Sequence, residues 1–267
     1  MMKHMHRTSF ALISILVTAG LILLLADVYS DLLAAEVKID PLPDELAAMK
    51  KAEANPSKAN IEALSDIRYR HAIRLMQLSE KNKGKNSLEL AVMYAESTTE
   101  LSPNSAKYWA LLGMLYERMK DNQLAQIMAV EALKKAVMLN PMDLGSRLLL
   151  GYLYFSDERY SLALEQYEEV VNIDSYMIQP SIIASMCIAY IVDFQHERGA
   201  NFFKRVLSKH PDADTARLGL AILLKQKKNT NEAEMELQKI IKSSKASAFN
   251  RQYSKKLIQQ WKKEVPE

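Results

Sequence analysis

The sequence predicts an all-α protein, a solenoid of antiparallel helix pairs preceded by one transmembrane helix. Three observations support this prediction. The 267 residues include only seven glycines, although tight hairpins and phosphate loops need residues that accept positive φ. Ala, Leu, Lys, Glu, Gln and Met, which favour helices, dominate the chain. Small residues also recur at nearly constant spacing, as described below.

The N-terminal segment 10–26 reads FALISILVTAGLILLLA and carries no charge. At ~1.5 Å per residue it forms roughly 25 Å of helix, close to the about 30 Å of a bilayer core. Lys3 and Arg7 precede it, and Asp27 and Asp31 follow it. The positive-inside bias therefore places the N-terminus in the cytoplasm and the rest of the chain outside it, in the periplasm of a Gram-negative cell.

A cleavable signal peptide is the competing interpretation of this segment. Val28, Tyr29 and Ser30 satisfy the small-residue rule at a cleavage site. The apolar run, however, exceeds the ~7–15 residues usual for a signal core, which favours an uncleaved anchor. Both interpretations export the remainder of the chain.

A first-helix motif recurs along the chain. Its small residue lies at Gly113, Gly151, Cys187 and Ala221, with intervals of 38, 36 and 34 residues. The copies decrease in strength along the chain: Trp109-x-x-Leu112-Gly113-x-x-Tyr116, Leu150-Gly151-x-x-Tyr154, Met186-Cys187-x-x-Tyr190 and Leu220-Ala221-x-x-Leu224.

The second helix of each unit carries its own small residue, which recurs with a similar period. Its small residues are Ala91, Ala129, Ala163, Gly199 and Ala233, with intervals of 38, 34, 36 and 34 residues. Two helices that cross closely need small residues at the crossing, while larger apolar residues fill the adjacent holes. A proline ends three of the units by removing a hydrogen-bond donor: Pro103, Pro141 and Pro211.

The W-x₂-L-G-x₂-Y motif and the period near 34 resemble the tetratricopeptide-repeat (TPR) family over about residues 86–245. This chain departs from the family pattern twice. Four extra residues lie between Tyr116 and Ala129, roughly one helical turn, and two more lie within 175–180.

The predicted organisation has four parts. Residues 1–30 hold the cytoplasmic tip and the anchor, and 31–57 form a linker with a short helix at 44–54. About five TPR units follow over 58–245, the first one degenerate, with its two helices joined by a Lys-Asn-Lys-Gly turn. Residues 246–267 form a capping helix, whose apolar face is expected to consist of Phe249, Tyr253, Leu257 and Trp261.

The TPR resemblance implies a concave groove lined by the first helix of each unit. In the two middle units, whose first helices carry Gly151 and Cys187, the groove positions include no Lys, Arg or Asn, so they do not form the carboxylate clamp of some TPR domains. The apolar lining instead suits a helical or hydrophobic segment of a protein partner. The alternative is that these side chains are ordinary core. The candidate groove residues are Met114, Leu148, Tyr152, Phe155, Ala184, Ile188, Ile191, Leu218 and Ile222.

Other function classes find little support. A net charge of +3 without a dense basic face argues against nucleic acid. No Gly-rich loop, nucleophile elbow or paired-carboxylate motif is present, so we expect no enzyme, cofactor or small-molecule substrate. His196 and Glu197 lack the spacing of a zinc motif, and Cys187 occupies a small-residue packing position. No metal site is therefore expected.

The leading hypothesis is a membrane-tethered scaffold that assembles an envelope complex. One narrower resemblance rests on the architecture and on residues 108–174. It is to the TPR part of bacterial cytochrome c maturation factors, and it implies that the groove presents an apocytochrome for haem attachment. A third possibility is a structural subunit whose groove is filled by its own complex.

The anchoring hypothesis makes a direct prediction. If residues 10–26 span the membrane uncleaved, the mature protein begins at Met1 or Met2 and resists carbonate extraction. N-terminal sequencing together with extraction checks this. A mature sequence that starts near Asp31 would decide for a signal peptide.

Overall fold

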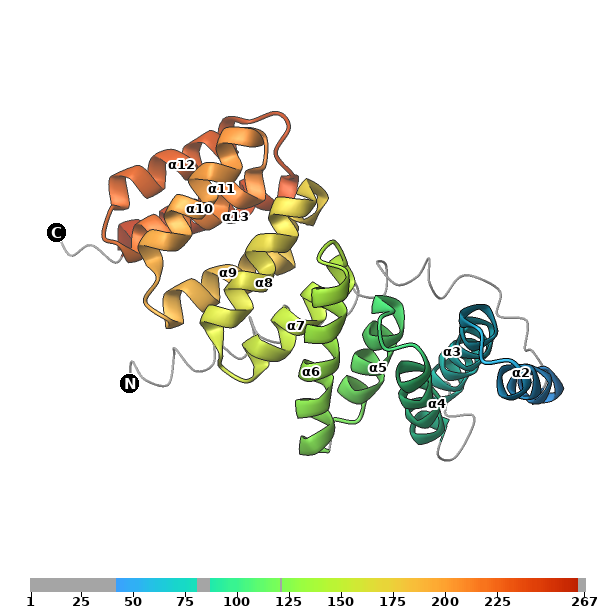
Figure 1. Ribbon diagram of the computed structural model, residues 1–267. Helices are drawn as coiled ribbons and strands as arrows, with labels where there is room; N and C mark the ends of the chain where they lie inside the picture. Colours follow the sequence, from blue (N-terminus) through green and yellow to red (C-terminus); the bar gives the residue numbers. More distant parts are fainter. Residues whose placement is uncertain (1–41, 81–86, 121, 264–267) are drawn as a thin grey trace. The chain divides into compact units, whose positions relative to one another are not determined.

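The computed structural model describes residues 42–80, 87–120 and 122–263. Within these ranges the chain is all-helical and has no strand, as the sequence predicts (Figure 1). The expected anchor at 10–26 and the expected Lys-Asn-Lys-Gly turn at 81–84 lie outside the described residues. The helices are α2 (Leu42–Ala54), α3 (Lys58–Glu80), α4 (Ser87–Leu101), α5 (Ala106–Arg118), α6 (Gln123–Leu139), α7 (Leu144–Ser156), α8 (Tyr160–Ile173), α9 (Pro180–Val192), α10 (His196–Lys209), α11 (Asp214–Gln226), α12 (Thr230–Lys242) and α13 (Ala248–Lys263).

The described residues form two compact units, 42–153 and 154–263. In the N-terminal unit, α3 packs on α4 and α5 packs on α6 as antiparallel pairs (Figure 1). Gly113 lies where α5 and α6 touch. A Cβ atom there would be 2.6 Å from Leu133 Cγ and 3.2 Å from the Ala129 carbonyl oxygen. Leu133 and Ala129 are both fully buried, so the crossing tolerates no side chain at residue 113.

The C-terminal unit repeats this arrangement with α10 packed on α11, and α11 on α12. Here Gly199 of α10 supplies the close approach. A Cβ atom at Gly199 would lie 2.6 Å from the ring of Tyr190 and 2.5 Å from Leu223 Cδ1. The largest fully buried side chains of this unit are Tyr167, Tyr190, Phe202, Phe203, Leu164, Ile182 and Met186.

A second contact recurs at the start of the first helices. The Trp109 indole N–H donates to the carbonyl of Pro103, six residues earlier, at 2.8 Å. Arg147 Nε makes the same bond to the Pro141 carbonyl at 2.8 Å, and Arg217 to that of Pro211 at 2.6 Å. In α7 and α11, arginine thus replaces the tryptophan of α5 while keeping the hydrogen bond.

Both predicted departures from the 34-residue period are confirmed. Helix α6 has 17 residues, against 14 in α8 and α10. The extra length therefore extends the second helix of this unit by about one turn. The two extra residues after α8 form a short 3₁₀ turn at Ser175–Met177, capped by the Asp174 carboxylate, which accepts from the Tyr176 N–H at 2.8 Å.

The capping helix is present as α13. Of its expected apolar face, Trp261 is buried and Leu257 is half-buried, but Phe249 and Tyr253 were wrongly included. Phe249 and Tyr253 are 66% and 37% exposed, whereas Asn250, Ser254 and Trp261 are buried. Asn250 Nδ2 donates to Asp214 Oδ2 at 2.9 Å and to Thr215 Oγ1 at 3.2 Å. These polar contacts set the rotation of α13, so the buried stripe begins at Asn250 and not at Phe249.

The helix crossing at Gly113 yields a stability prediction. Gly113→Leu overpacks the α5–α6 contact, and we expect a loss of ~1–3 kcal/mol in the free energy of unfolding. Urea denaturation measures it, with Glu131→Leu on the exposed side of α6 as the control. Equal stability of the Gly113 variant and the parent protein would show that the register is wrong.

Candidate partner-binding surface

Three predicted groove residues belong to the N-terminal unit. Leu148 is fully buried and Met114 is 8% exposed, so both contribute mainly to packing. Tyr152 is half-buried. In this unit the predicted groove positions therefore leave little apolar surface free for a partner.

The C-terminal unit differs, because its first helices keep an apolar strip partly exposed. Ile188 and Ile191 of α9 and Ile222 of α11 are half-buried, as is Ala184. Helices α9 and α11 pack against each other. Leu218, also predicted, is only 9% exposed. Below, "apolar strip" means these four half-buried residues: Ala184, Ile188, Ile191 and Ile222.

Phe155, the remaining predicted groove residue, is half-buried at the end of α7. Its ring packs edge-on against Tyr160 of α8, with 5.5 Å between ring centroids. Phe155 thus stabilises the α7–α8 turn. That turn also contains Glu158 at φ 58°, a left-handed conformation that recurs at Phe194 and Lys228, one unit and two units later.

Helix α13 extends the series of first helices, which sequence reasoning missed. Arg251 lies 34 residues after Arg217, and its Nη1 donates to the Ser243 carbonyl at 3.2 Å, as Arg217 does to the Pro211 carbonyl. This register places Phe249 at the position of Thr215 in α11, but Thr215 is 8% exposed and Phe249 is 66% exposed. The spacing of the two arginines was the signal for the register of α13, whereas the exposure of Phe249 is seen only in the structure.

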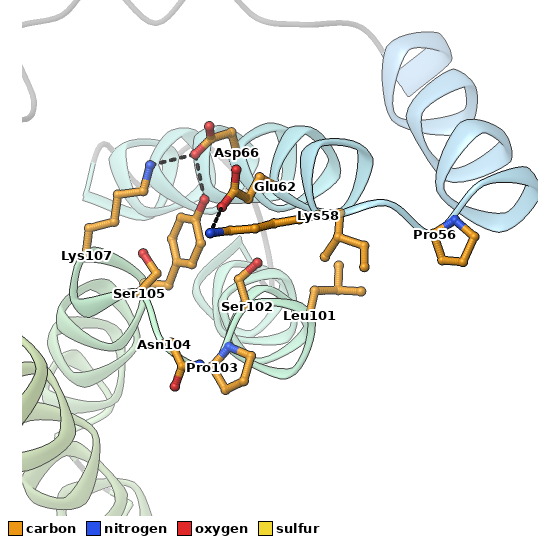
Figure 2. Close-up of a pocket in the computed structure, with 12 residues that line it drawn as sticks. Pro56, Lys58, Glu62, Asp66, Leu101, Ser102, Pro103, Asn104, Ser105 and Lys107 are labelled. Atoms are coloured by element: carbon orange, nitrogen blue, oxygen red, sulfur yellow. Dashed lines mark hydrogen bonds and ion pairs between the residues drawn. The ribbon is translucent and has the colours of Figure 1, made fainter.

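The N-terminal unit holds a polar cleft of about 660 Å³ between α3, the α4–α5 connection and the start of α5 (Figure 2). Asp66 Oδ1 accepts hydrogen bonds from Lys107 Nζ at 2.7 Å and from the Tyr108 hydroxyl at 2.6 Å. Lys58 pairs with Glu62 at 3.8 Å. The charged groups at this cleft therefore satisfy one another, and they join α3 to α5.

The environment of Asp66 explains its ionisation. Burial alone would raise the pKa of this carboxyl, but hydrogen bonds from Lys107 and Tyr108 and nearby positive charges outweigh it and hold the pKa below its usual value. Burial, with the charges of Asp66 and Asp143, raises the pKa of Tyr69 to about 12. Asp66 thus stays ionised near neutral pH, and Tyr69 stays neutral.

A buried ion pair holds α2 in the N-terminal unit. Glu45 is 7% exposed and accepts from Arg68 Nε at 3.0 Å and from the Tyr94 hydroxyl at 3.2 Å. Arg68 also donates to Ser97. Because breaking a buried pair leaves an uncompensated charge, α2 is fixed against α3 and α4 by this network.

No group of His, Cys, Asp and Glu side chains in the described ranges is arranged to hold a metal ion. Burial raises the pKa of the Cys187 thiol to about 12, so this cysteine is an unreactive packing residue. None of the described helices has the length and apolarity to cross a membrane, and residues 10–26 are not among them.

The fold and the repeated crossings define an α-helical repeat protein of the kind that binds other proteins. Tetratricopeptide-repeat family models match residues 106–142 and 144–176, and another matches 193–249. The chain is a tetratricopeptide-repeat protein, as the sequence motifs indicated. No curated protein matches it.

Solved structures of similar fold include two other repeat proteins. A crystal structure of MamA has 14% identity and a TM-score of 0.46, and the match covers 69% of this chain and 95% of that one. YrrB, titled a TPR protein with an unusual peptide-binding site, has 18% identity and a TM-score of 0.48, with 79% and 98% covered. MamA from Desulfovibrio magneticus RS-1 has 20% identity and a TM-score of 0.42, with 63% and 92% covered. Likenesses this distant carry no information about the partner of this chain.

The Asp66–Lys107 pair gives a prediction for stability and pH. Both side chains are about half exposed, so a double-mutant cycle with Asp66→Asn and Lys107→Met should give a coupling of ~0.2–1 kcal/mol at pH 7. Because the folded-state pKa of Asp66 is lowered, this coupling is present above the unfolded pKa and disappears as pH falls through the folded value. Urea titrations at several pH values measure it. A coupling that persists unchanged in strong acid would contradict the assignment.

Proposed function

We propose that this protein is a membrane-tethered scaffold that binds a helical or hydrophobic segment of a partner protein and helps to assemble an envelope complex. The observation that supports this proposal is the apolar strip of α9 and α11, with Ile188, Ile191 and Ile222 only half-buried. Tetratricopeptide-repeat proteins generally act as scaffolds and not as catalysts, and we propose the same for this chain.

The strip has the chemistry for one amphipathic helix. Its residues come from neighbouring first helices that pack on each other. Residues 184, 188 and 191 are three and four apart, so they share one side of α9. A partner helix with apolar residues at the same spacing would cover what remains exposed. Each buried Å² contributes about 25 cal/mol, so three isoleucines supply a useful part of the binding free energy.

The proposed membrane link rests on residues 1–41. The uncharged run at 10–26, with Lys3 and Arg7 before it and Asp27 and Asp31 after it, favours one membrane span with the repeats outside the cytoplasm. The segment 27–41 joins it to α2, and an extended chain of that length reaches up to ~50 Å. The repeats can therefore contact a partner near the membrane surface.

A peptide-binding experiment tests the groove. The probe is a panel of fluorescent amphipathic peptides with Leu at positions i, i+3, i+4 and i+7, measured by anisotropy against the full chain in detergent. We expect at least one peptide to bind, and Ile188→Asp with Ile222→Asp to weaken it at least tenfold without changing helicity, because both positions are partly exposed.

Two control variants make the result decisive. Met93→Asp with Ile127→Asp alters residues that are 62% and 58% exposed on the second helices α4 and α6, and it should leave peptide binding intact. Ile182→Asp, at a fully buried residue of α9, should unfold the unit. If the Ile188 and Ile222 variant also unfolds, or if it folds and binds normally, the groove assignment fails.

A further inference from the structure

The end of the chain carries a strongly basic surface. Residues 237–263 contain eight Lys and Arg and no Asp or Glu. Two of these cations are already paired, Lys239 with Glu236 at 2.6 Å and Lys245 with Asp212 at 2.6 Å. On α13 four exposed lysines remain on a helix that has no acidic residue: Lys255, Lys256, Lys262 and Lys263.

The same helix exposes an aromatic pair. The rings of Phe249 and Tyr253 stack with 5.9 Å between centroids and 6° between planes, and they are 66% and 37% exposed. Burial, with Cys187 of α9 nearby, raises the pKa of Tyr253. Phe249 and Tyr253 are four residues apart and therefore share one side of α13. A large exposed aromatic surface of this kind is typical of binding sites.

The repeat register relates this surface to the apolar strip, and α11 packs against α13. Because Arg251 corresponds to Arg217, Lys256 corresponds to Ile222 of the strip, 34 residues earlier. Lys225, one turn after Ile222, already contacts α13, with its Nζ 5.2 Å from the centre of the Trp261 ring. The binding surface therefore changes from isoleucine on α9 and α11 to aromatic and lysine residues on α13.

We infer that α13 binds an acidic stretch of the partner segment whose apolar face lies on α9 and α11. This inference rests on the proposed function and specifies the partner: an amphipathic helix that continues into, or ends in, a cluster of Asp and Glu. The acidic end meets the lysines of α13, which fixes the direction of the bound segment. Charge complementarity of this type favours one orientation and speeds association.

A single peptide helix fits these observations better than a membrane surface does. Ile222 is half-buried on α11, which packs against α13, so a single helix reaches it whereas the plane of a bilayer does not. An acidic peptide satisfies both parts of the surface at once. An anionic lipid surface would use only the lysines and the aromatic pair, and the experiment below distinguishes the two.

The test uses two labelled peptides with the same Leu stripe, one ending in four glutamates and the other in four lysines. With the full chain in neutral detergent at low salt, we expect the glutamate peptide to bind at least tenfold more tightly. Added salt should reduce this preference, since the lysines are exposed. Changing all four α13 lysines to glutamine, as Lys255→Gln, Lys256→Gln, Lys262→Gln and Lys263→Gln, should abolish it.

A matched variant removes the same charge elsewhere. Lys50→Gln, Lys51→Gln, Lys58→Gln and Lys120→Gln change exposed lysines of the N-terminal unit and should keep the preference. Equal binding of both peptides to the unmodified protein would overturn the role of α13 while leaving the groove intact. Absence of binding by either peptide would refute the proposed function itself.

The lipid outcome is measured with the same protein. The four α13 lysines are acetylated with acetic anhydride in the presence of the glutamate peptide or of phosphatidylglycerol vesicles. Mass spectrometry then measures how far these lysines are modified. Protection by the peptide supports the inference. Protection by the vesicles and not by the peptide would assign α13 to a membrane surface and overturn it.

Discussion

Close approach of paired helices is the constraint on which the remainder of this structure depends. At Gly113 and Gly199 a Cβ atom would lie within 2.6 Å of a neighbouring side chain. The backbone of the glycine helix therefore packs directly against side chains of its neighbour. Each helix pair buries its apolar residues only against adjacent pairs, and the crossing fixes which residues face inward. The half-buried positions of α9 and α11 follow from that geometry.

Much of the fold could be predicted from the sequence because the determinants are local. Small residues at a fixed interval gave the register of both helices, and the interval of 38 residues correctly located the extra turn of α6. The 3₁₀ turn after α8 likewise follows from two inserted residues. These features depend on spacing along the chain, which a single sequence shows directly.

The exposure of the groove residues could not be predicted in the same way. Met114 and Ile222 hold equivalent places in the repeat, one residue after Gly113 and Ala221, yet Met114 is only 8% exposed and Ile222 is half-buried. The rotation of α13 depends on Asn250, which pairs with Asp214 and Thr215 from more than thirty residues away. Apolar periodicity carries no information about such long-range polar contacts, so Phe249 was wrongly assigned to the core.

Site-specific photo-crosslinking in cells tests most directly the claim that the first helices of the C-terminal unit bind a partner. A benzophenone side chain is introduced at Ile188 or Ile222, and at the 62% exposed Met138 of α6 as the reference position. The account predicts that residues 188 and 222 crosslink to the same second polypeptide and that residue 138 does not. Crosslinks from 188 and 222 only to residues of this chain would show a self-filled groove and contradict it.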